Sequence, residues 1–323
     1  MAHYPFPMYA RQFMDSAKTH YDDLVWEKMN DRYRRIGRDI KMLYEKKIIS
    51  TLSPRKMTVE DCKEYILYRR SLINPRTQEL FTEAEHRHDQ SAMKLLFKYP
   101  KVRNTAFEDC LMYYPHIKAR DIHKRKPPLT DEQYSILKAK CDLVAENCPD
   151  DWYAVLPYGI VGFYLGTASR TIEGQFCDVH NIDLDNMTIQ LDIVKGIDTY
   201  GDPRVVPIHP DFQPIIKAFL ILRARLLSER KLENKALFIN IRGDGNGRLS
   251  DKSIRYHKTK VEKELGFKFD IRKTRRTRCM LMKKKLIRTD VACRVAGNSE
   301  RVFEKYYGIV ENTDAVDIVK DQW

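Results

Sequence analysis

Residues 272–277 read Arg-Lys-Thr-Arg-Arg-Thr, residues 296–299 read Ala-Gly-Asn-Ser, and residues 304–308 read Glu-Lys-Tyr-Tyr-Gly. Between Ile271 and Arg288 the chain carries nine Lys or Arg residues and no acidic residue. Because an unpaired buried charge is costly, a segment this basic cannot pack against an ordinary apolar core. It is either a solvated basic helix or a surface that binds a polyanion. The segments that precede it in the sequence indicate which of the two it is.

The chain as a whole is basic and long enough for two domains. It has 323 residues, and 58 Lys and Arg against 45 Asp and Glu give a net charge of +13. Compact domains usually contain about 100 to 200 residues, and an excess of positive charge favours a nucleic acid or another anionic surface as partner. The hydrophobic fraction of 43% predicts real cores rather than a disordered basic tail.

Several classes of protein are disfavoured by the sequence. The seven cysteines are scattered and form no Cys-x-x-Cys pair. This predicts thiols in a reducing compartment, with neither a zinc site nor a disulfide framework. No apolar run approaches the roughly 20 residues of a membrane helix, and the start of the chain lacks a signal-peptide pattern. We therefore expect a cytoplasmic protein with no membrane segment and no metal.

The N-terminal third predicts an all-helical domain. Residues 1–15 contain two prolines and little periodicity, and we expect them to be flexible. Over residues 16–47 apolar side chains recur at three- and four-residue spacing, which is typical of an amphipathic helix with Arg35 and Arg38 on its polar face. Further helices are indicated and no strand is, so residues 16–116 are expected to form a helical domain.

A basic segment over residues 117–128 predicts the linker between the domains. It ends with Lys124, Arg125 and Lys126 followed by two prolines. Proline and like charges keep such a segment extended. The linker either lies along a phosphate backbone or is simply solvated.

Residues 129–308 mix helix and strand. Thr130 with Gln133 three residues later is a capping box that begins a helix. In order, the patterns predict a helix over about 130–145, a buried helix over 153–165, a β-hairpin from 187–194 and 204–208, and helices over 212–227 and 250–265. The expected fold is mainly α with a small β-sheet, an all-helical domain followed by an α+β domain.

Four places in this second domain carry chemistry. Arg170 follows a run of small residues, and Glu173 can orient its guanidinium toward a phosphate or can simply pair with it. Lys195 lies in the hairpin turn, where its ammonium group either reaches a leaving oxygen or remains solvated. The third place is the basic box at 272–277, and the fourth is the tyrosine pair at 306–307.

Taken in this order, the four places resemble the tyrosine recombinase (integrase) family. That family has an Arg in an Arg-x-x-Glu motif, a hairpin Lys, a His-x-x-Arg box, a Gly-His motif and a nucleophilic Tyr. Pro-Pro-Leu-Thr-x-Glu at 127–132 and Arg-Val-Val-Pro at 204–207 are also similar to the family's second domain. The resemblance covers residues 128–310, whereas the helical domain is similar only in outline to the family's core-binding domain.

The resemblance implies a role for each chemical residue. The implied catalytic residues are Arg170 and Arg275 as phosphate clamps, Lys195 as general acid, Arg272 and Asn298 at the two histidine positions, and Tyr307 as nucleophile, with Tyr306 as the alternative nucleophile. Arg275 lies 22 residues before Gly297, and Tyr307 lies nine residues after Asn298, as in the family. Reading Arg272 as the arginine of the box needs an insertion, so we prefer Arg275.

The chain departs from the family at both histidines, because no histidine follows His257. An arginine cannot exchange protons near neutral pH, although Asn298 can still donate a hydrogen bond to a phosphate oxygen. The acid–base work then falls on Lys195. This loss either slows the chemistry or marks a member that binds DNA without cutting it.

The function implied by the resemblance is site-specific recombination of duplex DNA through a 3′-phosphotyrosyl intermediate. The ester conserves the bond energy, so neither ATP nor a metal nor another cofactor is expected. The residues expected to contact DNA are Arg35, Arg38, Lys124, Arg125, Lys126, Lys273 and Arg276. A type IB topoisomerase and a DNA-binding regulator on the same fold are the alternatives. We expect a monomer in solution and a homotetramer on DNA, with the tail 309–323 docking on its own domain or on a neighbouring subunit.

Overall fold

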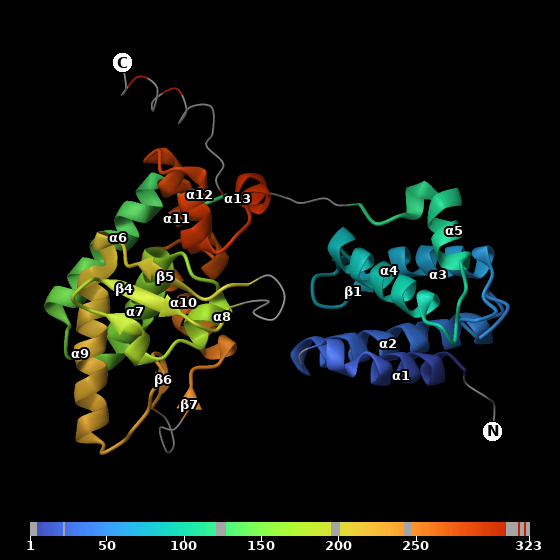
Figure 1. Ribbon diagram of the computed structural model, residues 1–323, viewed down its shortest axis with the longest axis horizontal. Helices are drawn as coiled ribbons and strands as arrows, with labels where there is room; N and C mark the ends of the chain where they lie inside the picture. Colours follow the sequence, from blue (N-terminus) through green and yellow to red (C-terminus); the bar gives the residue numbers. More distant parts are fainter. Residues whose placement is uncertain are drawn as a thin grey trace. The chain divides into compact units, whose positions relative to one another are not determined.

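The computed structural model of the chain describes residues 5–21, 23–120, 127–194, 201–241 and 247–307, together with the helical positions Val316 and Lys320 (Figure 1). The chain divides into two compact units, residues 1–124 and residues 125–323, which we call unit 1 and unit 2. The division falls inside the predicted linker, whose basic residues Lys124, Arg125 and Lys126 lie outside the described residues. None of the described helices is long and apolar enough to cross a lipid bilayer.

Unit 1 is a helical domain with one very short hairpin. Its elements are α1 (Pro5–Ser16), η1 (Lys18–His20), α2 (Asp23–Glu45), α3 (Val59–Ser71), β1 (Ile73–Asn74), β2 (Glu79–Leu80), α4 (Glu83–Lys98), α5 (Ala106–Tyr113) and η2 (Pro115–Ile117). The apolar faces of these helices meet in one core, in which Phe6, Ile36 and Phe107 are fully buried. The helical domain predicted from the sequence is thus present.

The N-terminus of unit 1 differs from expectation. The prediction of a flexible segment at residues 1–15 is wrong for its described part, because α1 is a regular helix from Pro5 onward. Phe6, Ala10 and Met14 recur every four residues, so all three face the core. Proline is tolerated in the first turn of a helix, where its missing N–H would have no intrahelical partner.

Two further differences concern short segments of unit 1. The hairpin of β1 and β2, in which Ile73 pairs with Leu80, lies in a domain where no strand is predicted. The start of the predicted linker is folded onto unit 1. The side chain of Gln90, on α4, donates to the carbonyl of Ile117 and accepts from the N–H of Ala119, both at 2.9 Å.

Unit 2 contains the α+β arrangement that the sequence predicts. Its helices are α6 (Asp131–Asn147), α7 (Trp152–Thr167), α8 (Thr171–Gln175), η3 (Val179–Asn181), η4 (Pro210–Phe212), α9 (Gln213–Glu229), α10 (Asp251–Leu265), α11 (Ile271–Lys284), α12 (Thr289–Ala296) and α13 (Glu300–Tyr306). Its strands are β3 (Ile182–Asp183), β4 (Thr188–Leu191), β5 (Arg204–Pro207), β6 (Ile239–Asn240) and β7 (Gly247–Arg248). The predicted capping box is present, with Thr130 accepting from the N–H of Gln133.

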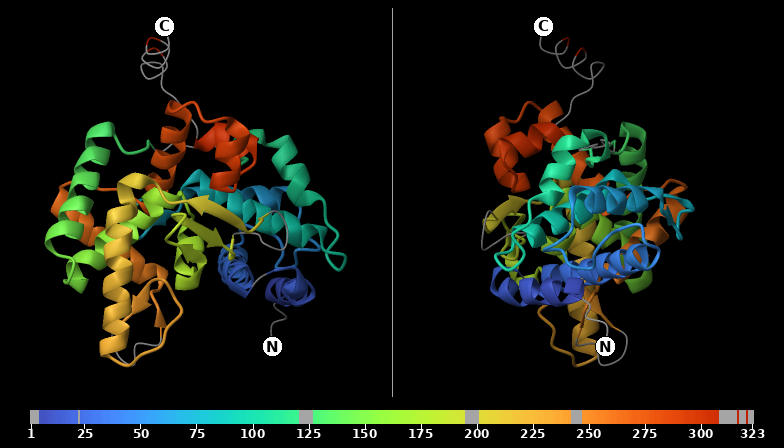
Figure 2. Two further views of the ribbon diagram at one scale, coloured as in Figure 1. Left: turned by 60° about the vertical axis from the view of Figure 1, so that its left-hand side comes forward. Right: turned by 90° about the vertical axis from the view of Figure 1, so that its right-hand side faces the viewer.

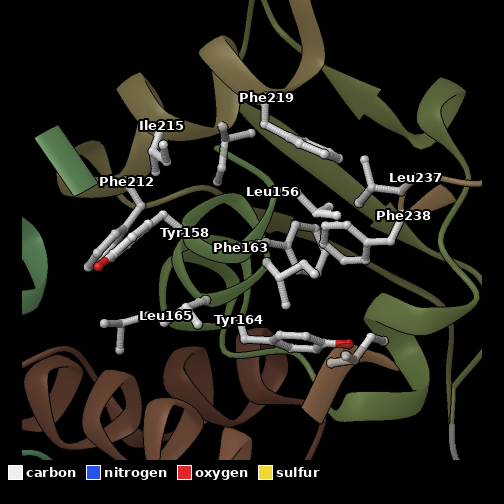
Figure 3. Packing of buried hydrophobic residues seen from close by; sticks show 14 of the residues in the cluster. Leu156, Tyr158, Phe163, Tyr164, Leu165, Phe212, Ile215, Phe219, Leu237 and Phe238 are labelled. Atoms are coloured by element: carbon white, nitrogen blue, oxygen red, sulfur yellow. The ribbon is translucent and has the colours of Figure 1, made fainter. Parts of the chain in front are cut away.

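The predicted buried helix, α7, runs through the core of unit 2. It is apolar on every side, as expected of a helix without a solvent face. It packs against α6, α9, α10 and α11. Figure 3 shows Tyr158, Phe163 and Tyr164 of α7 among side chains that include Phe212, Phe219 and Phe238. This central helix fixes the position of the segment that follows its last turn.

The sheet and the C-terminal helices complete unit 2. Strands β3, β4 and β5 form an antiparallel sheet, in which Leu191 of β4 pairs with Arg204 of β5. The predicted hairpin is therefore confirmed, and β3 is an additional strand. Helices α11, α12 and α13 gather in one group at one end of the unit (Figure 2), around a small core that contains Ala168, Cys279 and Phe303.

Candidate active site

Arg170 is presented by the break that ends α7. Ala168 takes a left-handed backbone conformation there, with φ of 55°, and stops the helix. Arg170 then begins α8, and its Nη1 donates to Glu173 Oε1 at 2.7 Å. Its backbone N–H donates to Glu173 Oε2, also at 2.7 Å. The Arg170–Glu173 pair suggested by the sequence is therefore present.

Glu173 is shared with a second arginine, Arg204, for which the sequence indicates no role. From the start of β5, Arg204 donates through Nη1 and Nη2 to the two carboxylate oxygens, at 3.2 and 2.8 Å. The side chain of Glu173 is fully buried. Burial raises the pKa of this carboxyl, but hydrogen bonds and charges from Arg204 and Arg170 outweigh it, so the pKa lies below its ordinary value. The carboxylate therefore holds both guanidinium groups.

Arg275 lies on the buried face of α11, with only 2% of its surface exposed. Its terminal nitrogens donate to the carbonyl oxygens of Ala168 and Ala296, at the ends of α7 and α12. Burial lowers the pKa of Arg275, and the positive charge of Arg170 acts in the same direction. The Nε of Arg275 is buried and has no hydrogen-bond partner among the described residues.

Asn298 follows Gly297, whose left-handed conformation (φ 63°) ends α12. The Nη2 of Arg170 donates to the Gly297 carbonyl and, at 2.7 Å, to Asn298 Oδ1. These contacts use part of the guanidinium fork that, from the sequence, is expected to face a phosphate. Because Oδ1 of Asn298 accepts, its Nδ2 remains as a donor. That Nδ2 is buried and, within the described part of the chain, has no partner.

Tyr307 stands at the end of α13, which Phe303 anchors in the small core of the C-terminal helices. The Tyr307 ring covers the guanidinium of Arg275, whose Cζ lies 5.0 Å from the ring centroid, within the range of a cation–π contact. Tyr306 lies instead beside Lys305, whose Nζ is 5.1 Å from the Tyr306 ring. Of the two candidate nucleophiles, Tyr307 is the one placed against Arg275.

These side chains form an environment suited to an anion. Arg170 and Arg275 bring fixed positive charge. The Nε of Arg275 and Nδ2 of Asn298 are buried donors without a partner in the described ranges, and a buried donor left unsatisfied costs about 1–3 kcal/mol. A phosphate oxygen would satisfy such donors. Nowhere in the described ranges do three His, Cys, Asp or Glu side chains gather as the ligands of a metal ion would.

Of Arg272 and Lys195, the two remaining predicted catalytic residues, the structure describes Arg272. Arg272 lies on α11 about one turn before Arg275 and is exposed to solvent. Lys195 falls in the connection between β4 and β5, outside the described residues. Most of the tail, 309–323, is likewise outside them.

Of the predicted DNA-binding residues that the structure describes, two lie on α2 and two on α11. Arg38 is exposed and, together with Arg35, lines an open hollow of about 850 Å³ whose walls carry mainly basic residues of α2. Arg35 also pairs with Asp89 of α4. Lys273 and Arg276 are partly buried on α11, and each hydrogen-bonds to a side chain of unit 2.

Solved structures of several recombinases and integrases have a similar fold. The XerH site-specific recombinase, in a post-cleavage complex with a palindromic difH substrate, is 14% identical, with a TM-score of 0.65 over 96% of this chain and 83% of that chain. The Tn1549 transposon integrase, in complex with circular intermediate DNA, is 15% identical, with a TM-score of 0.63 over 96% of this chain and 98% of that one.

A third similar structure is a lambda integrase dimer bound to a COC′ core site. It is 12% identical, with a TM-score of 0.58 over 98% of this chain and 77% of that one. No protein-family model and no curated protein matches the sequence. The mainly helical composition with small sheets agrees with these structures and with the fold class predicted from the sequence. The chain therefore has the fold of the tyrosine recombinases and integrases.

Proposed function

We propose that this chain is a site-specific DNA recombinase that cuts and rejoins duplex DNA through a 3′-phosphotyrosyl intermediate. The observation that carries the proposal is that four separate segments bring together Arg170, Arg275, Asn298 and Tyr307. Two buried donors of this group have no hydrogen-bond partner among the residues that the structure describes. The recombinases and integrases of similar fold, which are bound to DNA in their structures, support the same function.

The proposed chemistry follows from the charges of the site. A phosphodiester under attack gains negative charge on its non-bridging oxygens, and donors fixed in advance stabilise that charge. Arg275 Nε, Asn298 Nδ2 and the solvent-facing edge of Arg170, whose side chain is 22% exposed, would receive these oxygens. The Tyr307 ring covers Arg275, so it must slide off the guanidinium as the phosphate enters.

Attack by the Tyr307 hydroxyl forms an ester to the 3′ phosphate and breaks the bond to the 5′ oxygen. Lys195 protonates that oxygen as it leaves. Because the ester conserves the bond energy, attack by a 5′ hydroxyl of DNA rejoins the strand without ATP. Neither Arg272 nor Asn298 can take the tyrosine proton near neutral pH, so the proton passes to solvent and cleavage is slow.

The absence of both family histidines favours a second candidate function. With arginine and asparagine at both histidine positions, the chain can be a DNA-binding regulator that keeps the fold and the phosphate site without cutting. In either case the partner is duplex DNA, which the basic face of α2 and the linker residues Lys124, Arg125 and Lys126 would contact. For the recombinase we further propose a homotetramer on paired DNA sites, formed from monomers.

A trapping experiment separates these functions. The full chain is incubated with a library of nicked duplexes of randomised sequence, in which the nick lets the short 5′ fragment leave and prevents religation. The recombinase should give a covalent protein–DNA band on a denaturing gel, and sequencing that band yields the preferred site. Tyr307→Phe should abolish the band while retaining DNA binding, and Tyr306→Phe is the matched control that keeps it.

The other outcomes point elsewhere. Loss of the band in Tyr306→Phe with its retention in Tyr307→Phe would place the nucleophile one residue earlier. DNA binding without any covalent band would favour the regulator. Relaxation of supercoiled plasmid by a monomer, with no paired-site complex, would favour the topoisomerase.

A further inference from the structure

Arg204 connects three parts of the candidate site that are distant in sequence. Its Nε donates to the carbonyl of Val295 in the last turn of α12, at 3.0 Å. Its two terminal nitrogens hold the two oxygens of Glu173. Its own backbone pairs with Leu191 of β4, in the hairpin whose connection contains Lys195. One side chain thus joins the hairpin, α8 and α12.

The arrangement of Glu173 shows how Arg204 acts on Arg170. The fork of Arg204 grips the carboxylate on both oxygens, and this two-point contact fixes its plane. Arg170 uses the same two oxygens, through Nη1 and through its backbone N–H. Because the guanidinium is planar and rigid, fixing Nη1 helps to set the direction of Nη2, which donates to Gly297 and Asn298.

The absence of a side chain at Gly297 is a second feature that depends on Arg204. A Cβ built on Gly297 would lie 2.6 Å from Cζ and 2.7 Å from Nη1 of Arg204, closer than real side-chain contacts. The guanidinium of Arg204 therefore lies directly against the backbone that precedes Asn298. A glycine is required there both for the positive φ and for the close approach of Arg204.

We propose that Arg204 is a positioning residue for strand cleavage. It aims Arg170 at the scissile phosphate through Glu173, and it fixes strand β5 relative to the segment that bears Asn298. This inference rests on the proposed recombinase function. Arg204 itself is not expected to touch the phosphate, because each of its three nitrogens already donates to Glu173 or Val295 and only 10% of its side chain is exposed.

The test compares two substrates in single-turnover cleavage by the full chain. One nicked duplex carries an ordinary scissile phosphodiester, and the other carries a methylphosphonate, in which a methyl group replaces one non-bridging oxygen and removes its negative charge. Arg204→Lys keeps the charge but loses the fork, and Arg170→Ala serves as the reference. A misplacement of about 1 Å can slow a reaction by about 100-fold, so we expect Arg204→Lys to cleave the phosphodiester roughly 100 times more slowly.

The methylphosphonate should rescue both variants to within about threefold of the wild type, because it has no charge for Arg170 to hold. DNA affinity should be unchanged. Arg204 does not act through Arg170 if Arg204→Lys cleaves the phosphodiester at the wild-type rate, or if its loss is equal on both substrates. A wild-type protein that forms no covalent adduct removes the proposed function itself and with it this role of Arg204.

A second pair of variants covers the case in which Arg204→Lys does not fold. Gly297→Ala drives a Cβ into Arg204, and it should reproduce both the slow cleavage of the phosphodiester and the rescue. Gly266→Ala is its control, because Gly266 has a similar positive φ of 77° but nothing within 4 Å of the added Cβ. Gly266→Ala should cleave at the wild-type rate. Equal effects of the two substitutions would show that backbone strain, not Arg204, causes the loss.

Discussion

Replacing Glu173 with Gln tests the charge balance of the site. The substitution keeps the shape of the side chain and removes the one negative charge that two guanidinium groups share. In the wild type the carboxylate accepts two hydrogen bonds from Arg170, both at 2.7 Å, and two from Arg204, at 3.2 and 2.8 Å. Glutamine accepts through one oxygen only and turns an amide NH₂ group toward the other donors.

We expect Glu173→Gln to lower the free energy of unfolding strongly, because the carboxylate is fully buried. Removing one partner of a buried ion pair costs about 3–5 kcal/mol. Arg170 is 22% exposed and can recover part of this by moving toward water, whereas Arg204 is only 10% exposed and cannot. We therefore expect the free energy of unfolding of unit 2 to fall by about 3 kcal/mol, out of the roughly 5–15 kcal/mol typical of a domain.

Native-state hydrogen exchange read by mass spectrometry measures this loss, because amides of α7 and α12 report unit 2 separately from unit 1. The matched control is Glu304→Gln, which makes the same chemical change in the Lys283–Glu304 pair, where the Glu304 side chain is 49% exposed. That control should cost less than about 1 kcal/mol. If Glu173→Gln also costs less than about 1 kcal/mol, the two guanidinium groups do not depend on the carboxylate and the reasoning is refuted.

The same experiment has a pH dependence of known sign. The folded-state pKa of Glu173 lies below its ordinary value of 4.5, so the unfolded state binds the proton more readily. The stabilisation is therefore fully present above about pH 4.5 and is lost as the pH falls through the folded-state pKa. The stabilities of the wild type and Glu173→Gln should converge at that acidic end, and a constant difference down to low pH would contradict this.

Two other substitutions test the acid–base groups. Lys195→Ala should slow cleavage of an ordinary substrate and be rescued by a 5′-phosphorothiolate, whose sulfur leaves without a proton; equal loss on both would mean that Lys195 only positions DNA. His209 should destabilise unit 2 in acid, because burial and the positive charge of Arg278 lower its pKa from 6.5 to about 4. Its Nδ1 also accepts a hydrogen bond from the N–H of Asp211, which only the neutral ring can do. Stability should fall by about 1.4 kcal/mol per unit as the pH drops from 6.5 toward 4, and His209→Asn, which keeps a capping side chain, should flatten that slope in acid-unfolding measurements.

The features of the fold that sequence predicts here are those set by local chemistry. Thr130 and Gln133 satisfy each other's backbone donors within one turn of helix, so their pattern is visible without the rest of the molecule. The apolar run of α7 and the alternation of β4 are visible for the same reason. The strands β1, β2 and β3 have two residues each, which is too short for an alternating pattern to appear.

The helix α1 was not predicted from the sequence for a different reason. The prolines of α1 suggest a loose segment, and its buried residues Phe6, Ala10 and Met14 form a single narrow line. That line acquires meaning only when α2 and α4 lie beside it, because helix stability in proteins comes mostly from tertiary packing. Similarly, the sequence shows Arg204 only as the first residue of a strand and as part of the family-like Arg-Val-Val-Pro segment at 204–207, and neither gives it a role. Its partner Glu173 lies 31 positions earlier, and no local pattern joins the two.

The spacing between motifs distinguishes Arg275 from Arg272 but does not reveal the contacts of Arg275. Spacing favours Arg275, and in the structure Arg275 is the buried residue of the two, while Arg272 is exposed. Spacing gives no hint that both terminal nitrogens of Arg275 would be taken by backbone carbonyls. Those carbonyls belong to Ala168 and Ala296, each two residues before a site residue, Arg170 and Asn298 respectively.

Arg275 therefore braces the two segments that present its neighbours, and its Nε–H, which has no partner among the described residues, and the face under the Tyr307 ring are available to a phosphate. A lysine at position 275 would offer a single nitrogen in place of the two that hold these carbonyls in a fixed fork. The arginine is needed for the shape of the site as much as for its charge. For that reason loss of Arg275 should disturb Arg170 and Asn298 together.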